Sequence, residues 1–98
     1  METDKVEVVK RLTKAEKIAA EKGIHVGDVV KNVYNGKLCH TIVCDIVNDD
    51  NPFLLGKDFD EQGIITSRLG FRILSLSSVT EVEGPYDKNK LYVSQKGE

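Results

Sequence analysis

The spacing of hydrophobic positions changes at Gly23, and this change divides the chain into a helical part and a β-rich part. Before it, Thr13-Lys14-Ala15-Glu16 has the form of a capping box, in which two side chains satisfy free backbone donors at a helix start. Gly23 suits the left-handed residue that follows a helix. The pattern predicts a helix over residues 14–22. The apolar spacing at Val8 and Leu12 extends it to 4–22, although residues 4–12 also fit the start of a strand.

After Gly23 the apolar residues alternate with polar ones and many are β-branched, which is typical of half-buried strands. A strand is expected from Asp28 to Tyr34. Asn35-Gly36 then favours a tight hairpin, because a type I′ turn needs positive φ at both central residues. The return strand, Leu38 to Val47, is apolar on both faces. We therefore expect it to be covered by the N-terminal helix or by another subunit.

Polar turn residues at 48–52 end this strand, and further strands are expected at 53–57, 64–68, 71–76 and 78–83. About five or six short strands after one helix are typical of a small antiparallel barrel. The predicted fold class is α+β, mainly β, with an SH3-like or Sm-like barrel. We expect residues 1–98 to form a single domain: a helix at 4–22, the barrel at 24–84, and a polar tail at 85–98 that can add an edge strand.

Residues 24–84 resemble Sm-like barrels, and two segments within them are similar to the central part of WYL domains. These segments are Asn51-Pro52-Phe53-Leu54-Leu55-Gly56-Lys57-Asp58 and Gly70-Phe71-Arg72-Ile73-Leu74. The resemblance implies a barrel in which arginines near Phe71-Arg72 bind a nucleotide or nucleic acid. The chain departs from the family in two ways. Phe53-Leu54-Leu55 replaces the Trp-Tyr-Leu run, and two extra residues separate Arg72 from the final strand.

Size and charge limit the possible functions. The chain has 98 residues and a formal net charge of −2. A domain of this size has little interior volume for a deep cleft, so function is expected on the surface or between subunits. Between residues 24 and 84, nine carboxylates outnumber five basic side chains. This acidic body argues against a generic DNA-binding domain.

The compartment is inferred from the apolar runs and the cysteines. No apolar run is long enough to cross a bilayer, and the polar start lacks the apolar segment of a secretory signal. Cys39 and Cys44 would lie about 16 Å apart along one strand, too far for a disulfide. We expect a cytoplasmic protein with no membrane contact.

Residues with metal-binding or catalytic chemistry are few. Cys39-His40 with Cys44 suggests zinc. On one strand, however, the two cysteines would face opposite sides and His40 would lie about 13 Å from Cys44, so small buried cysteines explain the pattern better. Asp58 to Gly63 matches half of a calcium loop, whose twelfth position would be Leu69 instead of glutamate. No histidine stands beside an activated nucleophile in a recognisable motif. We predict no metal, no cofactor and no catalytic residue.

The remaining candidate site is a basic and aromatic surface. It comprises Lys31, Tyr34, Lys37, Arg68 and Arg72. Aromatic rings stack on bases, and arginine binds phosphates through paired donors. The sequence therefore favours a non-catalytic binding module, expected to be a homo-oligomer, that captures a nucleotide or a short single strand. The alternative is a protein–protein adaptor or inhibitor, as found among mobile-element and phage proteins, that docks on a basic partner through the helix and strand 38–47.

Overall fold

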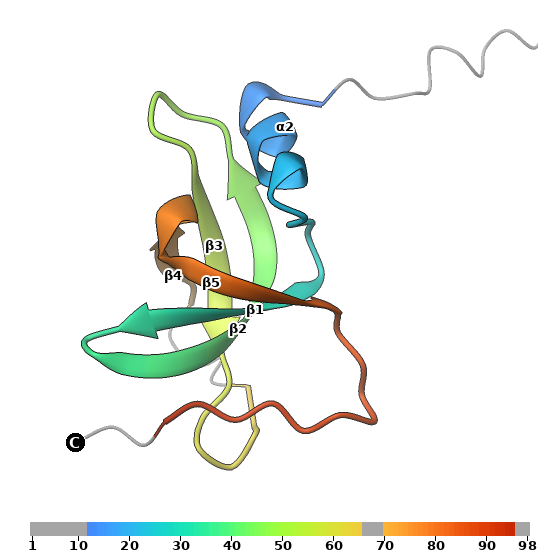
Figure 1. The fold of residues 1–98 in the computed structure, drawn as a ribbon, viewed down its shortest axis with the longest axis vertical. Helices are drawn as coiled ribbons and strands as arrows, with labels where there is room; N and C mark the ends of the chain where they lie inside the picture. The colour runs from blue at the N-terminus through green and yellow to red at the C-terminus, as the bar shows by residue number, and fades with distance from the viewer. Residues whose placement is uncertain (1–11, 66–69, 96–98) are drawn as a thin grey trace, which may run out of the picture.

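A computed structural model describes residues 12–65 and 70–95. Its elements, in chain order, are helix α2 (Lys14–Glu21), strands β1 (Asp28–Tyr34), β2 (Lys37–Val47), β3 (Phe53–Asp58) and β4 (Arg72–Ser75), the 3₁₀ helix η1 (Leu76–Ser78) and strand β5 (Val79–Pro85). Figure 1 shows the helix beside a strongly curved sheet. None of the described helices is long and apolar enough to cross a membrane.

The five strands form one antiparallel sheet in the order β4-β3-β2-β1-β5. The first four strands follow one another as a meander, and β5 returns across the molecule to pair with β1. Among the described residues no ladder joins β4 to β5, so the sheet is open. The mainly β fold with an N-terminal helix is confirmed, whereas closure into a barrel is not observed.

Helix α2 begins where the capping box predicts. Thr13 Oγ1 accepts a hydrogen bond from the Glu16 N–H, and Glu16 Oε1 accepts one from the Thr13 N–H. A further contact comes from the loop after β2, because the Ala15 N–H donates to Asn48 Oδ1 at 3.2 Å. The proposed extension of the helix over residues 4–11 lies outside the described residues.

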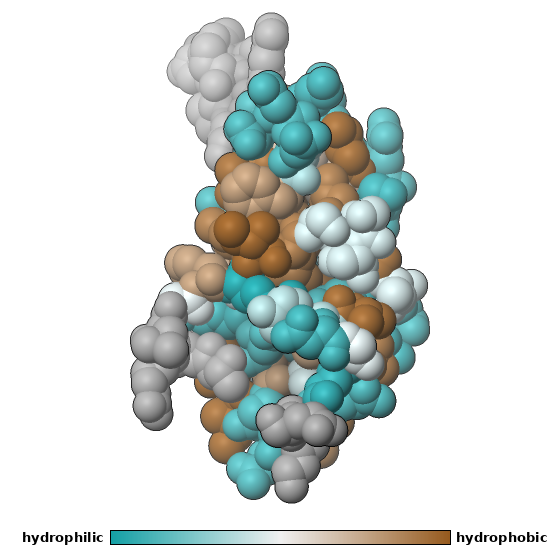
Figure 2. All heavy atoms as spheres, turned by 90° about the vertical axis from the view of Figure 1, so that its left-hand side faces the viewer, coloured by the Kyte–Doolittle hydropathy of each residue, from teal (hydrophilic) through white to brown (hydrophobic). Residues whose placement is uncertain are grey.

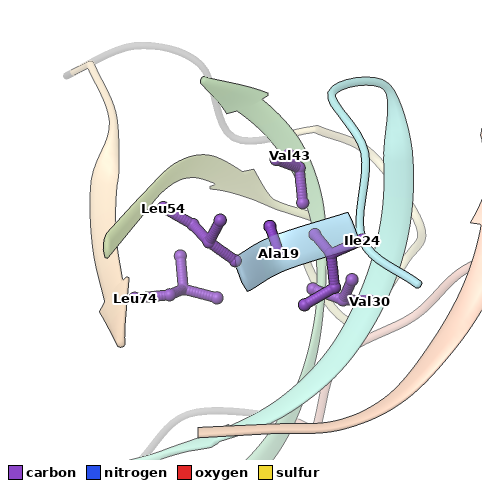
Figure 3. Packing of buried hydrophobic residues seen from close by; sticks show 6 residues of the cluster. All are labelled: Ala19, Ile24, Val30, Val43, Leu54 and Leu74. Atoms are coloured by element: carbon purple, nitrogen blue, oxygen red, sulfur yellow. The ribbon is translucent and has the colours of Figure 1, made fainter. Parts of the chain in front are cut away.

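The helix buries its alanine face against the sheet. Ala15 and Ala19 are fully buried. Ala19 packs in a cluster with Ile24 and one residue from each of four strands: Val30, Val43, Leu54 and Leu74. Figure 3 shows the other five side chains around Ala19. We call the side of the sheet that faces α2 the inner face.

Strand β2 is long, and it bends where Cys44 is inserted as an extra residue between Val43 and Asp45. Val43 packs in the inner cluster, whereas Ile42 packs against a second cluster on the opposite, outer face. Burial on both faces of this strand is therefore confirmed. Cys44 and Cys39 are free thiols.

The β1–β2 hairpin forms as predicted, with positive φ at Asn35 (52°) and Gly36 (76°). The expected strand 64–68 is different: Ile65 makes an isolated bridge to Phe59, and residues 66–69 lie outside the described residues. The expected final strand over 78–83 begins after η1 and runs as β5.

The C-terminal segment, residues 86–95, contains no strand and runs beneath the hairpin (Figure 1), where Tyr92 and Ser94 are buried against the outer face. Tyr92 is buried with Val29 and Phe59. The last described residues of the segment bind β2 beyond the end of β3. The Leu38 N–H donates to Gln95 Oε1, and the Gln95 N–H donates to Leu38 O, each at 2.8 Å. The segment expected to be a polar tail therefore covers one half of the outer face.

Candidate functional site

Arg72 is the centre of a polar cluster on the inner face of the sheet. Its Nε donates to Asp58 Oδ2 at 2.8 Å, and its Nη2 donates to Asp58 Oδ1 at 2.9 Å, which makes a bidentate ion pair. Nη2 also donates to Asn32 Oδ1 at 2.6 Å. Thr41 Oγ1 donates to Asp58 and accepts from the Asn32 amide. Asn32 and Thr41 are fully buried, so the cluster is part of the interior.

Gly56 makes room for this cluster. It lies opposite Arg72 in the β3–β4 register and opposite Val43 in the β2–β3 register. A Cβ atom at Gly56 would lie 2.5 Å from Thr41 Cγ2 and 2.8 Å from a backbone oxygen of β2. The missing side chain lets β3 pass close to β2 at the point where the guanidinium reaches Asn32.

Electrostatics hold the guanidinium in its charged form. Burial opposes the charge of Arg72, but the hydrogen bonds and the charge of Asp58 outweigh it, and the pKa of Arg72 is raised. The Tyr34 ring covers the guanidinium, with its centroid 4.3 Å from Cζ. The ring itself is 48% exposed. Tyr34 thus covers one face of the guanidinium in a partly buried ion pair.

Lys31 points to the outer face and belongs to a different cluster. Its Nζ lies 3.2 Å from Glu81 Oε1 and 3.4 Å from Glu83 Oε2. The hydrogen bond and charge of Glu81, with a further contribution from Glu83, raise the pKa of Lys31. His40 Nε2 also faces Glu83 at 3.4 Å, and its Nδ1 lies 2.6 Å from Val93 O. Two carboxylates therefore neutralise this lysine.

The structure brings together only part of the predicted surface. Tyr34 and Arg72 are in contact, and Lys37 lies opposite Tyr34 at the end of the hairpin. Lys31 lies on the other face, and Arg68 is outside the described residues. The five residues do not form one basic surface among the described positions.

A different feature appears on the open half of the outer face. Leu54 and Leu74 point inward, so their neighbours on the same strands point outward. We define the outer apolar patch as Val47, Phe53, Leu55, Phe71 and Ile73. Ile73 is 63% exposed and Phe71 is 54% exposed. Figure 2 shows hydrophobic surface gathered over this part of the sheet.

Acidic side chains border the outer apolar patch. Asp45 lies opposite Leu55 in the β2–β3 register, and Asp49 and Asp50 lie in the loop that joins these strands. All three are exposed, and within residues 12–65 and 70–95 no ion pair engages them. One cation is also present, since Lys57 Nζ lies 4.8 Å from the Phe71 ring centroid. The border of the patch is acidic overall.

Neither the partners of Arg72 nor the outer apolar patch was predicted from the sequence. Asn32 and Thr41 looked like ordinary strand residues, and Asp58 was considered as the first residue of a partial calcium loop. The one signal was that each lies an even number of residues from a buried inward residue on its strand. For metal binding, the described part of the chain contains no group of three or more histidine, cysteine, aspartate or glutamate side chains placed to hold an ion.

No family model, curated protein or solved structure matches the chain. The resemblance to Sm-like and WYL domains therefore stays a prediction.

Proposed function

We propose that the protein is a non-catalytic docking module whose outer apolar patch binds a partner protein with a basic and apolar surface. The observation that carries this proposal is an exposed apolar patch with an acidic border, which no described segment of the chain covers. Soluble monomers seldom leave contiguous apolar surface uncovered, and such surfaces commonly mark interaction sites. The acidic border favours a basic partner, because complementary charges speed association and suppress wrong partners.

The contact surface in this proposal differs from the one expected from sequence. The helix and the first half of β2 are already used. Ala15 and Ala19 are buried, and this half of β2 packs on its inner face through Val43 and on its outer face through Ile42. The same acidic border would meet itself if two copies docked through this face. The patch therefore favours a different protein over a second copy, and the expected homo-oligomer would need another surface.

An SH3-like barrel remains the finer description that we propose for the fold. It is supported by the return of β5 to β1 and by the single turn of 3₁₀ helix between β4 and β5. In this arrangement the inner cluster and the Arg72 network fill the interior. The outer patch then lies on the barrel wall, which is consistent with a docking role.

Affinity capture with matched variants tests the docking proposal. We expect the wild type to retain a defined set of basic proteins that is lost with Ile73→Lys and with the double variant D49K/D50K. Capture should weaken as salt is raised, because exposed charges are screened. Val26→Lys and Glu61→Lys are the controls, since both side chains are exposed away from the patch and should leave capture unchanged.

The same preparation distinguishes the nucleotide-binding alternative. That alternative is favoured by one observation, the exposed Tyr34 ring stacked on a guanidinium. Two results together would replace docking by nucleic-acid binding. A labelled oligothymidine would bind the wild type but not Tyr34→Ala, and Ile73→Lys and D49K/D50K would capture the same proteins as the wild type.

A further inference from the structure

Strand β4 forms one edge of the sheet, and its exposure adds detail to the proposed docking function. In the order β4-β3-β2-β1-β5 it pairs only with β3, and no described residue pairs with its other side. An unpaired strand edge presents free N–H and C=O groups that can bind another extended chain. Whether β4 can do so depends on which of its backbone groups point outward.

The direction of these groups follows from one hydrogen bond at the end of β3. The Phe59 N–H donates to His40 O at 3.0 Å, so the backbone groups of Phe59 face β2. Backbone groups alternate in direction along a strand, and the extra residue of the bulge lies in β2, not in β3. The groups of Gly56 and Leu54, at the intervening positions, therefore face β4.

The register then fixes the direction along β4. Gly56 pairs with Arg72 and Leu54 pairs with Leu74, with no irregularity between them. Arg72 and Leu74 consequently direct their backbone groups at β3. Ile73, which lies between them, directs its N–H and C=O away from β3, in the plane of the sheet and toward its open edge.

Apart from its short length of four residues, this edge lacks the features that usually protect an edge strand. Natural edges are blocked by lysine, proline, bulges or charged side chains. Strand β4 has no lysine, proline or bulge, and its one charge, Arg72, is bound to Asp58 on the inner face. The other edge is different, since β5 carries two glutamates, ends in Pro85 and is irregular against β1.

We infer that the partner docks by adding an extended strand to the free edge of β4, hydrogen-bonded to Ile73. This inference rests on the proposed docking function and names the form in which the partner binds. Main-chain hydrogen bonds would supply affinity, and alternate apolar side chains of the added strand would extend the patch beside Ile73 and Phe71. The required partner is a β-forming segment with apolar residues at every second position and basic residues at its ends.

A synthetic peptide of this pattern, Lys-Val-Thr-Val-Thr-Val-Lys, is the probe. Titration into the full-length protein, followed by amide NMR, should shift Ile73 and its neighbours. Hydrogen exchange at the Ile73 amide should slow by about tenfold or more, because this N–H gains a partner. Exchange at Leu74, already paired with β3, should change little. A titration that leaves the β4 amides unmoved would overturn the inference.

Two variants at one position separate the backbone contribution from the side-chain contribution. Ile73→Pro keeps an apolar side chain but removes the outward N–H, which a proline at an edge can do without breaking the inner ladder. We expect it to weaken peptide binding by about tenfold, the effect of about 1.4 kcal/mol, while Ile73→Val binds within about twofold of the wild type. Preserved exchange protection at Leu74 shows that Ile73→Pro keeps the β3–β4 pairing.

The pattern of results distinguishes failure of the inference from failure of the docking proposal. If Ile73→Pro binds the peptide and captures proteins like the wild type, while Ile73→Lys loses capture, docking stands and strand addition is wrong. If Ile73→Lys also captures proteins like the wild type, the docking proposal fails as well.

Discussion

At the scale of single residues, the role of Arg72 is decided by three partners that are distant in sequence. Asp58, Thr41 and Asn32 lie 14, 31 and 40 positions away and converge on one guanidinium. With Tyr34 over its face, this arginine is placed to stabilise the fold. A phosphate would meet a guanidinium whose Nε and Nη2 already donate to Asp58 and Asn32.

Removal of the guanidinium is therefore expected to act on stability. Arg72→Ala leaves the half-buried Asp58 without its counter-charge and should lower the free energy of unfolding by about 3 kcal/mol. Arg72→Lys keeps the charge but loses the bidentate geometry, and should cost about half as much. Chemical denaturation measures both, with the exposed Lys88→Ala as the control. A fully stable Arg72→Ala protein would contradict the structural role.

At the scale of elements, the C-terminal segment completes the sheet where β3 ends. Beyond Asp58, the backbone groups of Leu38 and His40 on β2 find partners in Gln95, Ser94 and Phe59. Tyr92 anchors the segment by packing against Phe59, with ring centroids 5.2 Å apart. The segment behaves as part of the domain despite its polar composition.

Loss of this anchor should release the segment. Tyr92→Ala is expected to cost about 3 kcal/mol of stability, because a buried aromatic ring is deleted. Amide exchange at Leu38 and His40 should accelerate in the same variant. Tyr92→Phe is the matched control, since it removes only the 3.2 Å hydrogen bond from the Asp87 N–H and should cost about 1 kcal/mol or less. Unchanged protection at Leu38 and His40 in Tyr92→Ala would argue against an anchored segment.

Sequence patterns predicted the local features of these elements better than their long-range contacts. The capping box at Thr13 and the Asn35-Gly36 turn are set by adjacent residues, and both formed as expected. The bulge at Cys44 was not foreseen, because the apolar run through it hides a change of phase. Tyr92 was placed in a polar tail, since its burial depends on Phe59 far away in the chain.

At the scale of the whole molecule, the two faces of the sheet differ in how they are covered. Helix α2 packs on the apolar half of the inner face, and in the polar half the Tyr34 ring lies over the Arg72 guanidinium. The C-terminal segment packs on one end of the outer face, and no segment within residues 12–65 and 70–95 covers the other end. Basic and aromatic residues in the sequence suggested a site for an anion, but the surface that stays uncovered is apolar with an acidic border. Which surface remains open depends on packing between distant segments, and composition does not determine it.

Two carboxylates link the fold of the whole molecule to pH. Burial alone would raise the pKa of Glu83, but hydrogen bonds and charges from His40 and Lys31 lower it below its usual value. The backbone N–H of Ile64, with help from neighbouring amides, lowers the pKa of Asp60. In both cases the folded state favours the ionised form.

Stability from these groups is therefore fully present above the pKa of the unfolded chain, about 4 for both residue types, and is lost as pH falls through the lower folded values. We therefore expect the urea concentration at the midpoint of unfolding to decrease as the pH is lowered from 5 to 3. The double variant Glu83→Gln and Asp60→Asn should be less stable than the wild type at pH 6 but should lose less on acidification, because neither amide titrates. Equal acid sensitivity of the two proteins would place the responsible carboxylates elsewhere in the chain.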